Sequence, residues 1–221
     1  MKLADRIGAE KDLRVALLQA SAGLLLIGGA MATWRQVVIA QAQYRLNVTI
    51  RVATAFTSAL EQIGAAESIP RRVGGVYALE RIAAEDPTEK PRVVGVLCAF
   101  IRQPPQHAMA SISPDVQAAL AVLSRIKSPH ERIILDEAKL RGANLRGLNF
   151  EQASFRGAVL ADADLTGASL RGCDLTAADL RNAALKGADL SEAVTEEALL
   201  SAGDVLGTSS SRRQPFPRDG L

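Results

Sequence analysis

Large apolar side chains recur every five residues through the C-terminal third of the chain. Leucine or phenylalanine occupies every fifth position from residue 135 to residue 190, and a small residue, usually alanine, lies two positions before most of them. Aspartate or asparagine often comes directly before the large residue, as in Ala143–Asn144–Leu145. A period of five matches neither an α-helix nor a flat β-strand, whose apolar positions recur at about 3.6 and about 2 residues. The chain is therefore predicted to turn a corner every five residues and to point one large and one small side chain inward between corners.

Glycine favours such corners because it tolerates backbone angles that strain other residues. It follows the large residue by two positions in half of the repeats, at 142, 147, 157, 167, 172 and 187. Four sides of five residues make a coil of twenty, so the twelve repeats predict three coils. At about 4.8 Å per coil the stack is about 14 Å tall. Each coil can bury its faces only against its neighbours, so both ends need a cap.

The repeat resembles the motif of the pentapeptide-repeat family, in which a small residue and an aspartate or asparagine precede each leucine. The resemblance implies a right-handed, four-sided β-helix over residues 131–194, with the leucine, phenylalanine and alanine side chains stacked inside. Cys173 occupies one of the inward small positions. It is therefore expected to be a core residue rather than a disulfide partner.

A second apolar pattern lies near the start of the chain, where residues 15–34 form a run of twenty without a charged side chain. As a helix rising about 1.5 Å per residue, this run spans about 30 Å, the thickness of a bilayer core. Trp34 and Arg35 at its end suit a membrane interface. The run is predicted to be a single transmembrane helix after an N-terminal tail of residues 1–14.

Two other interpretations of this run stay open. The run could be a cleaved signal peptide, with Ala30–Met31–Ala32 as the cleavage site. It could also be a helix of a soluble domain, because Gln19, Ser21 and the glycines lower its hydrophobicity. Basic residues lie on both sides of it, so the positive-inside rule does not orient it. The two cysteines are expected to be free thiols, which favours a reducing compartment. We therefore expect a single-pass protein of the cell membrane with its C-terminal region in the cytoplasm.

Apolar residues at helical spacing predict an α-helical section between this run and the repeats. A helical stalk over residues 35–68 is expected to end at Ile69–Pro70, because the residue before a proline disfavours helix. A helical capping region over residues 69–130 is then expected to cover the first coil. Its predicted helices span residues 72–84, 93–101 and 114–126.

Two sequences within this region indicate helix starts. Asp86–Pro87–Thr88 is predicted to cap one helix and restart the chain, and Ser113 is predicted to be the N-cap of the last helix, with Pro114 at its first position.

The segment after the repeats is expected to close the other end of the stack. Thr195–Leu200 is predicted to form a short helix within a C-terminal cap, residues 195–206, and residues 207–221, rich in Ser, Arg and Pro, are predicted to be disordered. The predicted fold class is α+β. It combines an N-terminal transmembrane helix and a helical region with a short right-handed quadrilateral β-helix.

The middle of the chain also resembles a group of uncharacterised membrane-anchored pentapeptide-repeat proteins of actinobacteria. The similar segments keep the order and spacing found there, and they are Phe56–Gly64, Arg72–Ala83, Val93–Arg102 and Asp115–Leu120. The resemblance covers roughly residues 50–195 and implies an anchor and this layout of elements. It implies no activity, cofactor or catalytic residue.

Candidate catalytic and metal-binding residues are few. His107 and His130 have no cysteine or carboxylate cluster at metal-ligand spacing. Ser124 and Lys127 fit a serine-x-x-lysine pattern, but the companion motifs of acyl-transferring enzymes are missing. The aspartates of the repeats are expected to hydrogen-bond at corners rather than to act as acids. The sequence therefore predicts a protein that is not an enzyme and holds no cofactor or metal.

Charge separates the remaining hypotheses. Residues 131–194 hold ten acidic and eight basic residues, a net charge of −2. A DNA duplex carries one charge per about 1.7 Å, so a three-coil stack imitates it poorly. A DNA-mimic modulator of gyrase or another topoisomerase is therefore the alternative hypothesis. Direct nucleic-acid binding is not expected, because outward positions lack aromatic residues for base stacking.

The leading hypothesis is a non-enzymatic, membrane-tethered interaction or scaffold module that presents the β-helix to a protein partner. Residues just after each central leucine are expected to face outward, and every twentieth residue falls on the same side. Four cations then gather on two neighbouring sides, and they form a candidate binding patch for an anionic lipid or an acidic partner: Arg141, Arg146, Arg181 and Lys186. We refer to these four residues as the cationic patch.

Overall fold

The computed structural model describes residues 29–31, 33–41, 43, 50–103, 112–127 and 131–200. The chain separates into two compact units, Met1–Ala53 and Thr54–Leu221, each of which is described by itself. The predictions for residues 1–28 and 201–221, and for both histidines, fall outside the described residues. Within the described residues, no helix has both the length and the apolar character needed to span a membrane. The anchor predicted over residues 15–34 stays a prediction.

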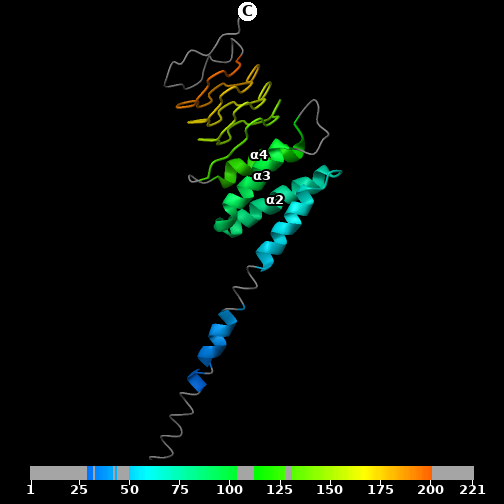
Figure 1. Ribbon diagram of the computed structural model, residues 1–221, viewed down its shortest axis with the longest axis vertical. Coiled ribbons are helices and arrows are strands. Elements are labelled where there is room, and N and C mark those ends of the chain that lie inside the picture. Colours follow the sequence, from blue (N-terminus) through cyan, green and yellow to red (C-terminus); the bar gives the residue numbers. More distant parts are fainter. Residues whose placement is uncertain are drawn as a thin grey trace, which may run out of the picture. The chain divides into compact units, whose positions relative to one another are not determined.

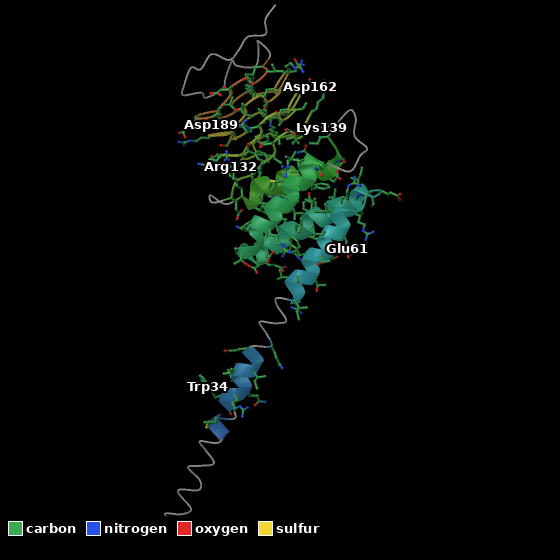
Figure 2. All side chains as sticks on the ribbon, viewed as in Figure 1. Trp34, Glu61, Arg132, Lys139, Asp162 and Asp189 are labelled. Carbon is green, nitrogen blue, oxygen red and sulfur yellow. The ribbon has the colours of Figure 1, made fainter. Side chains whose placement is uncertain are left out.

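The first unit contains helical residues whose apolar side chains are exposed. Residues 33–41 are helical. Trp34, labelled in Figure 2, is 71% exposed, and Ile39 is 53% exposed. Of the stalk predicted over residues 35–68, residues 35–41, 43 and 50–63 are helical, and the helix ends at residue 63 rather than at residue 68. A helix with large apolar side chains in contact with water lacks the burial that stabilises most helices.

The second unit opens with a helical segment that ends at residue 63, followed by α2, Ile69–Glu85 (Figure 1). Ser68 is the N-cap of α2, and its hydroxyl accepts from the backbone N–H of Arg71 at 3.4 Å. Pro70 occupies the first turn of this helix. The helix therefore begins three residues earlier than predicted, because a proline in the first turn loses no helical hydrogen bond.

Two further helices complete the helical part of this unit. A 3₁₀ turn, η1 at Pro87–Glu89, leads into α3, Lys90–Arg102, and α4 spans Pro114–Ile126. Asp86 caps η1 through its carboxylate, which accepts from the N–H of Thr88 at 3.0 Å. This agrees with the predicted cap and restart.

The three helices bury apolar side chains at helical spacing against one another. The most buried include Val76 and Leu79 on α2, Leu97 and Ile101 on α3, and Leu120 and Leu123 on α4. Gly75 allows the segment at residues 54–63 to approach α2 closely. A Cβ at Gly75 would lie 2.8 Å from the carbonyl oxygen of Ala59 and from the backbone N of Ile63.

A buried ion pair fastens the start of α4 to α2. Arg72 is 3% exposed and Asp115 is 1% exposed, and the Arg72 Nε donates to the Asp115 carboxylate. The Arg72 Nη1 also donates to the carbonyls of Ala65 and Ala66, at 2.9 and 2.7 Å. The pair thus holds the turn before α2 as well as α4.

Asp115 also changes the expected role of Ser113. Ser113 has the extended backbone of an N-cap, but its hydroxyl donates to Asp115 and makes no cap bond to the helix backbone. Ser113 is therefore the N-cap residue of α4, as predicted, but its side chain does not make the hydrogen bond to the helix backbone that is usual for an N-cap serine.

Residues 131–200 form stacked coils joined by parallel β-bridges, drawn from green to orange in Figure 1. Each bridged residue pairs with the residue twenty positions later, as in Asn144 with Asp164 and Asp164 with Ala184. The bridges fall into four columns, which makes four sides. The predicted coil of twenty residues is confirmed.

The interior of the coils is filled by the predicted side chains. Leu165 lies in the coil between those of Leu145 and Leu185, and these three are 0%, 0% and 2% exposed. Phe150 and Phe155 meet edge to face, with ring centroids 5.5 Å apart. Cys173 is a free, buried thiol, as expected from its inward position.

The corners have one backbone conformation in every repeat. The second residue after each central position has a φ between 57° and 70°, from Glu137 through Glu197. The central carbonyl accepts from the N–H three residues on, as in Leu145 to Leu148 at 3.1 Å. A positive φ at the third residue of such a turn is the type II arrangement, for which glycine is best suited. Non-glycine residues also occupy these corners, including Ala177.

The helix predicted for Thr195–Leu200 does not form. Leu199 instead makes a parallel bridge with Asp179. The N–H of Leu180 donates to the carbonyl of Leu199 at 2.8 Å, and the N–H of Leu199 donates to the carbonyl of Ala178 at 2.9 Å. Ala198 and Leu200 are buried as the small and large residues of a further repeat. The β-helix thus extends past residue 194 to at least residue 200, and residues 195–200 are not the expected separate cap.

Candidate interaction surface

The four bridge columns define the sides of the β-helix. We number the sides by the first bridged residue of each column: side 1 begins at Ile134, side 2 at Lys139, side 3 at Asn144 and side 4 at Asn149. Corner residues are counted with the side that they follow. Because the chain runs around the coil, sides 2 and 3 are neighbours, and so are sides 4 and 1.

Charges divide between these two pairs of sides. Sides 2 and 3, which we call the basic half, carry five cations and three carboxylates: Lys139, Arg141, Arg146, Arg181, Lys186, Asp162, Asp164 and Asp179. Sides 4 and 1, which we call the acidic half, carry two cations and eight carboxylates: Arg156, Arg171, Asp136, Glu137, Glu151, Asp174, Asp189, Glu192, Glu196 and Glu197. Figure 2 shows Lys139 and Asp162 at one margin of the coils and Asp189 at the other.

The structure places the cationic patch on the basic half, where its four side chains are all exposed. Ala161, which lies between Arg141 and Arg181 on side 2, was expected to face outward but is 6% exposed. Two of the arginines are held by carboxylates on their own half. Arg141 pairs with Asp162 at 2.8 Å, and Arg181 makes two bonds to Asp179, each at 2.8 Å.

Ion pairing makes the four cations unequal. Arg146 lies 4.0 Å from Asp164, at the limit of an ion pair. The bidentate bonds of Arg181 hold the pKa of Asp179 below its ordinary value, although burial acts in the opposite direction. These carboxylates screen the arginines from a partner, whereas Lys186 is exposed on side 3. These carboxylates lie just before the central leucine or at the corner, so the pattern of residues just after each leucine does not predict them.

The acidic half has fewer compensating cations. Arg156 pairs with Asp174 at 3.2 Å and Arg171 with Glu192 at 2.6 Å. The corner residues Glu137, Glu192 and Glu197 are all exposed. The net charge of the stack is therefore concentrated on sides 4 and 1.

The helices cap the first coil through side chains that replace a missing coil. Gln117 on α4 accepts from the N–H of Asn144 at 3.0 Å and donates to its carbonyl at 2.6 Å. Ser124 accepts from the N–H of Asn149 at 2.8 Å. These bonds satisfy backbone groups that an open edge would leave unpaired. Gln117 and Ser124 are therefore residues through which the helical region caps the first coil.

Lys127 and Cys98 extend this cap. The Lys127 amine donates to the carbonyl of Glu151, and the backbone N–H of Ile134 hydrogen-bonds to Cys98 on α3. Burial lowers the pKa of Lys127, and the charge of Glu151 acts against this. Ser124 and Lys127, which fit a catalytic pattern in the sequence, are therefore contacts between α4 and the first coil.

The two thiols are buried and unreactive by their surroundings. Burial raises the pKa of Cys173 to about 12 and also raises the pKa of Cys98. The Cys173 thiol donates to the carbonyl of Phe150 at 2.9 Å. The thiolate is the reactive form of cysteine, so neither residue is suited to nucleophilic chemistry. Among the described residues, no group of histidine, cysteine and carboxylate side chains could hold a metal ion.

Comparison with known proteins identifies the repeat. The family model for pentapeptide repeats matches eight copies, over residues 133–172 and 160–194. No curated protein matches the chain.

Several solved structures are similar to part of the chain. A pentapeptide repeat protein from the thylakoid lumen of Arabidopsis thaliana is 38% identical over 28% of this chain and 43% of its own, with a TM-score of 0.28. Rfr23 from the cyanobacterium Cyanothece 51142 is 29% identical over 37% and 54%, with a TM-score of 0.31. HetL, involved in heterocyst differentiation regulation in Nostoc, is 30% identical over 37% and 42%, with a TM-score of 0.19. The chain thus spans about half the length of these relatives.

Proposed function

We propose that this pentapeptide-repeat protein is a non-enzymatic interaction module that residues 15–34 tether to a membrane and whose binding surface is the β-helix. One observation carries the proposal: the inward positions of every described coil are filled by packed side chains, so the exposed outer sides are what the β-helix offers to a partner. Repeat surfaces of this type serve recognition rather than catalysis.

The charge division supports an orientation for the tethered module. A β-helix held close to an anionic membrane would turn its basic half toward the lipid headgroups and its acidic half away from them. Each exposed Lys or Arg near such a surface contributes about 1 kcal/mol, and salt weakens the attraction. Arg141 and Arg181 are already paired, so Lys139, Arg146 and Lys186 are expected to contribute most. A buried free thiol at both Cys98 and Cys173 is in keeping with a cytoplasmic location for this region.

The acidic half supports one alternative, a DNA-mimic modulator of gyrase or another topoisomerase. A duplex about 14 Å long carries about eight phosphates, and the acidic half carries eight carboxylates. The basic half opposes this alternative, because a duplex is anionic on every side. Binding of purified gyrase by the unit Thr54–Leu221, lost on replacing Glu137, Glu192 and Glu197 by Gln, would favour it over the membrane proposal.

Vesicle sedimentation tests the membrane-facing role of the basic half. The unit Thr54–Leu221 is mixed with vesicles of phosphatidylcholine alone or with vesicles rich in phosphatidylserine, whose surface potential is negative. We expect it to sediment with the anionic vesicles only, and less at high salt. Replacing Lys139 together with the four residues of the cationic patch by Gln should abolish most of this binding.

A matched control removes cations from the other half. Replacing Arg156 and Arg171 by Gln takes away exposed, ion-paired arginines of the same type, and it should leave vesicle binding unchanged. Equal binding to both vesicle types, or an equal loss in both variants, contradicts the lipid-facing role. The basic half would then be assigned to an acidic protein partner, to be sought by cross-linking the tagged full chain in native membranes.

A further inference from the structure

Sides 2 and 4 are opposite faces of the four-sided β-helix. Figure 2 shows Lys139 of side 2 and Asp189 of side 4 at opposite margins of the coils. With its corners, side 2 carries three cations and two carboxylates: Lys139, Arg141, Arg181, Asp162 and Asp179. Side 4 carries one cation and three carboxylates: Arg171, Glu151, Asp189 and Glu192. The two faces are therefore opposite in net charge.

The path of the chain decides which positions meet when two parallel copies lie side by side. The chain runs in opposite directions along opposite sides of a coil, so the residue after the centre of side 4 meets the residue before the centre of side 2. The chain also reaches side 4 half a coil later than side 2, about 2.4 Å further along the stack. Each residue of side 4 therefore lies level with the gap between two coils on side 2 of its neighbour.

Three charges of side 4 then meet charges of opposite sign on side 2 of the neighbouring copy. The pairs are Glu151 with Lys139, Arg171 with Asp179, and Asp189 with Arg181. Asp179 and Arg181 are already joined by two bonds of 2.8 Å within one copy, so the neighbour extends this pair into a row of alternating charges. The remaining charge of side 4, Glu192, falls opposite the buried Ala178.

We propose that tethered copies of this chain associate side by side, with side 2 of one copy against side 4 of the next. This rests on the proposed function, because the tether sets all copies in the same direction and lipid headgroups occupy side 3. Sides 2 and 4 then face the neighbouring copies. Since the two contact faces differ, each contact leaves one of either kind open, and copies add in a row.

Sides 1 and 3 are the other pair of opposite faces. They match in two pairs: Arg156 with Asp164, and Asp174 with Lys186. Side 3 belongs to the basic half, however, and in the proposed orientation it is turned to the lipid. The contact between sides 2 and 4 is the one that lipid binding leaves free.

The contact is small, so it depends on the tether. A side of five residues across three coils measures about 16 Å by about 14 Å, roughly 200 Å². Stable complexes bury about 800 Å² per partner. Exposed charge pairs also contribute little each, and salt screens them. The unit Thr54–Leu221 is therefore expected to stay monomeric in solution, whereas confinement to a membrane raises the local concentration enough for weak contacts to form.

Disulfide cross-linking of the full chain in membranes tests the contact. Leu199 on side 2 is 41% exposed, and Ser191 on side 4 holds the position that meets it. The two lie on opposite faces of one copy, so Leu199→Cys combined with Ser191→Cys joins copies but cannot close a disulfide within a copy. Oxidation of washed membranes should give a ladder of dimers, trimers and larger products. Cys98 and Cys173 are buried and do not contribute.

A matched control has the same two positions on the other pair of faces. Ala184→Cys on side 3 combined with Thr176→Cys on side 1 removes no charge and should give at most about a tenth of the product. Leu199→Cys alone should give no dimer, because the contact is not two-fold symmetric. A mixture of chains that carry either Leu199→Cys or Ser191→Cys should give dimers and nothing larger.

Charge reversal in the cross-linking variant tests the pairing itself. Glu151→Lys and Lys139→Glu should each lower the yield at least about threefold, because like charges then meet, and both together in one chain should restore it. Membranes that hold the protein but give no ladder overturn the proposal. An equal yield from the control pair, a dimer from Leu199→Cys alone, or no recovery in the double reversal also overturns it. Protein missing from the washed membranes contradicts the tether itself, and with it the row.

Discussion

Gly167 and Gly95 have equal room for a side chain but different backbone conformations. Neither would bring an added Cβ within 4 Å of another atom, but Gly167 is a corner residue with a φ of +67° and Gly95 lies inside α3. Alanine at a positive φ is strained by about 1–2 kcal/mol, whereas alanine in a helix interior is preferred over glycine by about 1 kcal/mol. The corners of the β-helix are thus set by backbone conformation rather than by space.

We predict opposite effects of the same substitution at these two positions. Gly167→Ala should lower the free energy of unfolding by about 1 kcal/mol, and Gly95→Ala should raise it by up to about 1 kcal/mol. Urea unfolding of the unit Thr54–Leu221 measures both. If the two variants change stability in the same direction, the left-handed corner conformation is not what selects glycine at 167.

Asp115 gives a prediction that depends on pH. Burial raises its pKa, but the hydrogen bonds from Ser113 and Arg72 and the charge of Arg72 outweigh burial and hold the pKa below its ordinary value of 3.8. A carboxyl whose pKa is lower in the folded chain stabilises it above the unfolded pKa, and this contribution is lost as the pH falls through the folded pKa.

The variant Asp115→Asn should therefore be less stable than the parent at pH 7, by on the order of 3 kcal/mol, because it leaves the Arg72 charge buried without its partner. The difference should begin to shrink as the pH falls below about 4, where the Asp115 carboxyl of the unfolded chain takes up a proton, and it should go on shrinking as the pH falls through the lower pKa of the folded chain. Urea midpoints of both proteins from pH 7 to pH 3 provide the measurement. A difference that stays constant across this range would contradict the assignment of the stability to the ionised carboxylate.

At the scale of elements, local sequence preference and tertiary pairing agree in some segments and conflict in others. The five-residue period predicted the coils because each side of a β-helix is a local unit with one inward large residue. Thr195–Leu200 has helix-favouring residues, and the prediction failed there because backbone bonds to the preceding coil override propensity. α2 began earlier than expected because Pro70 starts a helix as well as ending one.

The contact between α2 and the preceding helical segment yields a paired prediction at this scale. Gly75→Ala would set a Cβ 2.8 Å from backbone atoms of Ala59 and Ile63, whereas at Gly74 the nearest atom is the side-chain Oε1 of Gln62 at 3.4 Å. Overpacking against backbone costs about 1–3 kcal/mol. Gly75→Ala should therefore lower the free energy of unfolding by about that amount.

The control, Gly74→Ala, should be neutral or stabilising by up to about 1 kcal/mol, since the glutamine side chain can move aside and alanine favours helix. Thermal unfolding of both variants measures the difference in stability, and Gly75→Ala should unfold at the lower temperature. Two equally stable variants would mean that the close helix approach does not depend on Gly75.

At the scale of the molecule, the position of charges around the β-helix was only partly predictable. The twenty-residue period predicted that the four residues of the cationic patch lie on two neighbouring sides, and the bridge columns of the structure have them on sides 2 and 3. The carboxylates beside them lie at other positions of the repeat, and their pairing depends on side-chain reach between coils, as for Arg141 and Asp162. The residues that cap the first coil, Gln117 and Ser124, have no signature in the sequence because polar side chains on an amphipathic helix usually face solvent.

Attachment to a membrane through residues 15–34 is the claim on which the proposed function depends most. Cells of a bacterial host are made to produce the full chain or a chain that starts at Arg35, and their membranes are washed with alkaline carbonate, which removes peripheral proteins. We predict that the full chain stays in the membrane pellet and that the shorter chain is found in the supernatant. Full-length protein released by carbonate, or a mature N-terminus at Thr33 produced by cleavage, would contradict the account.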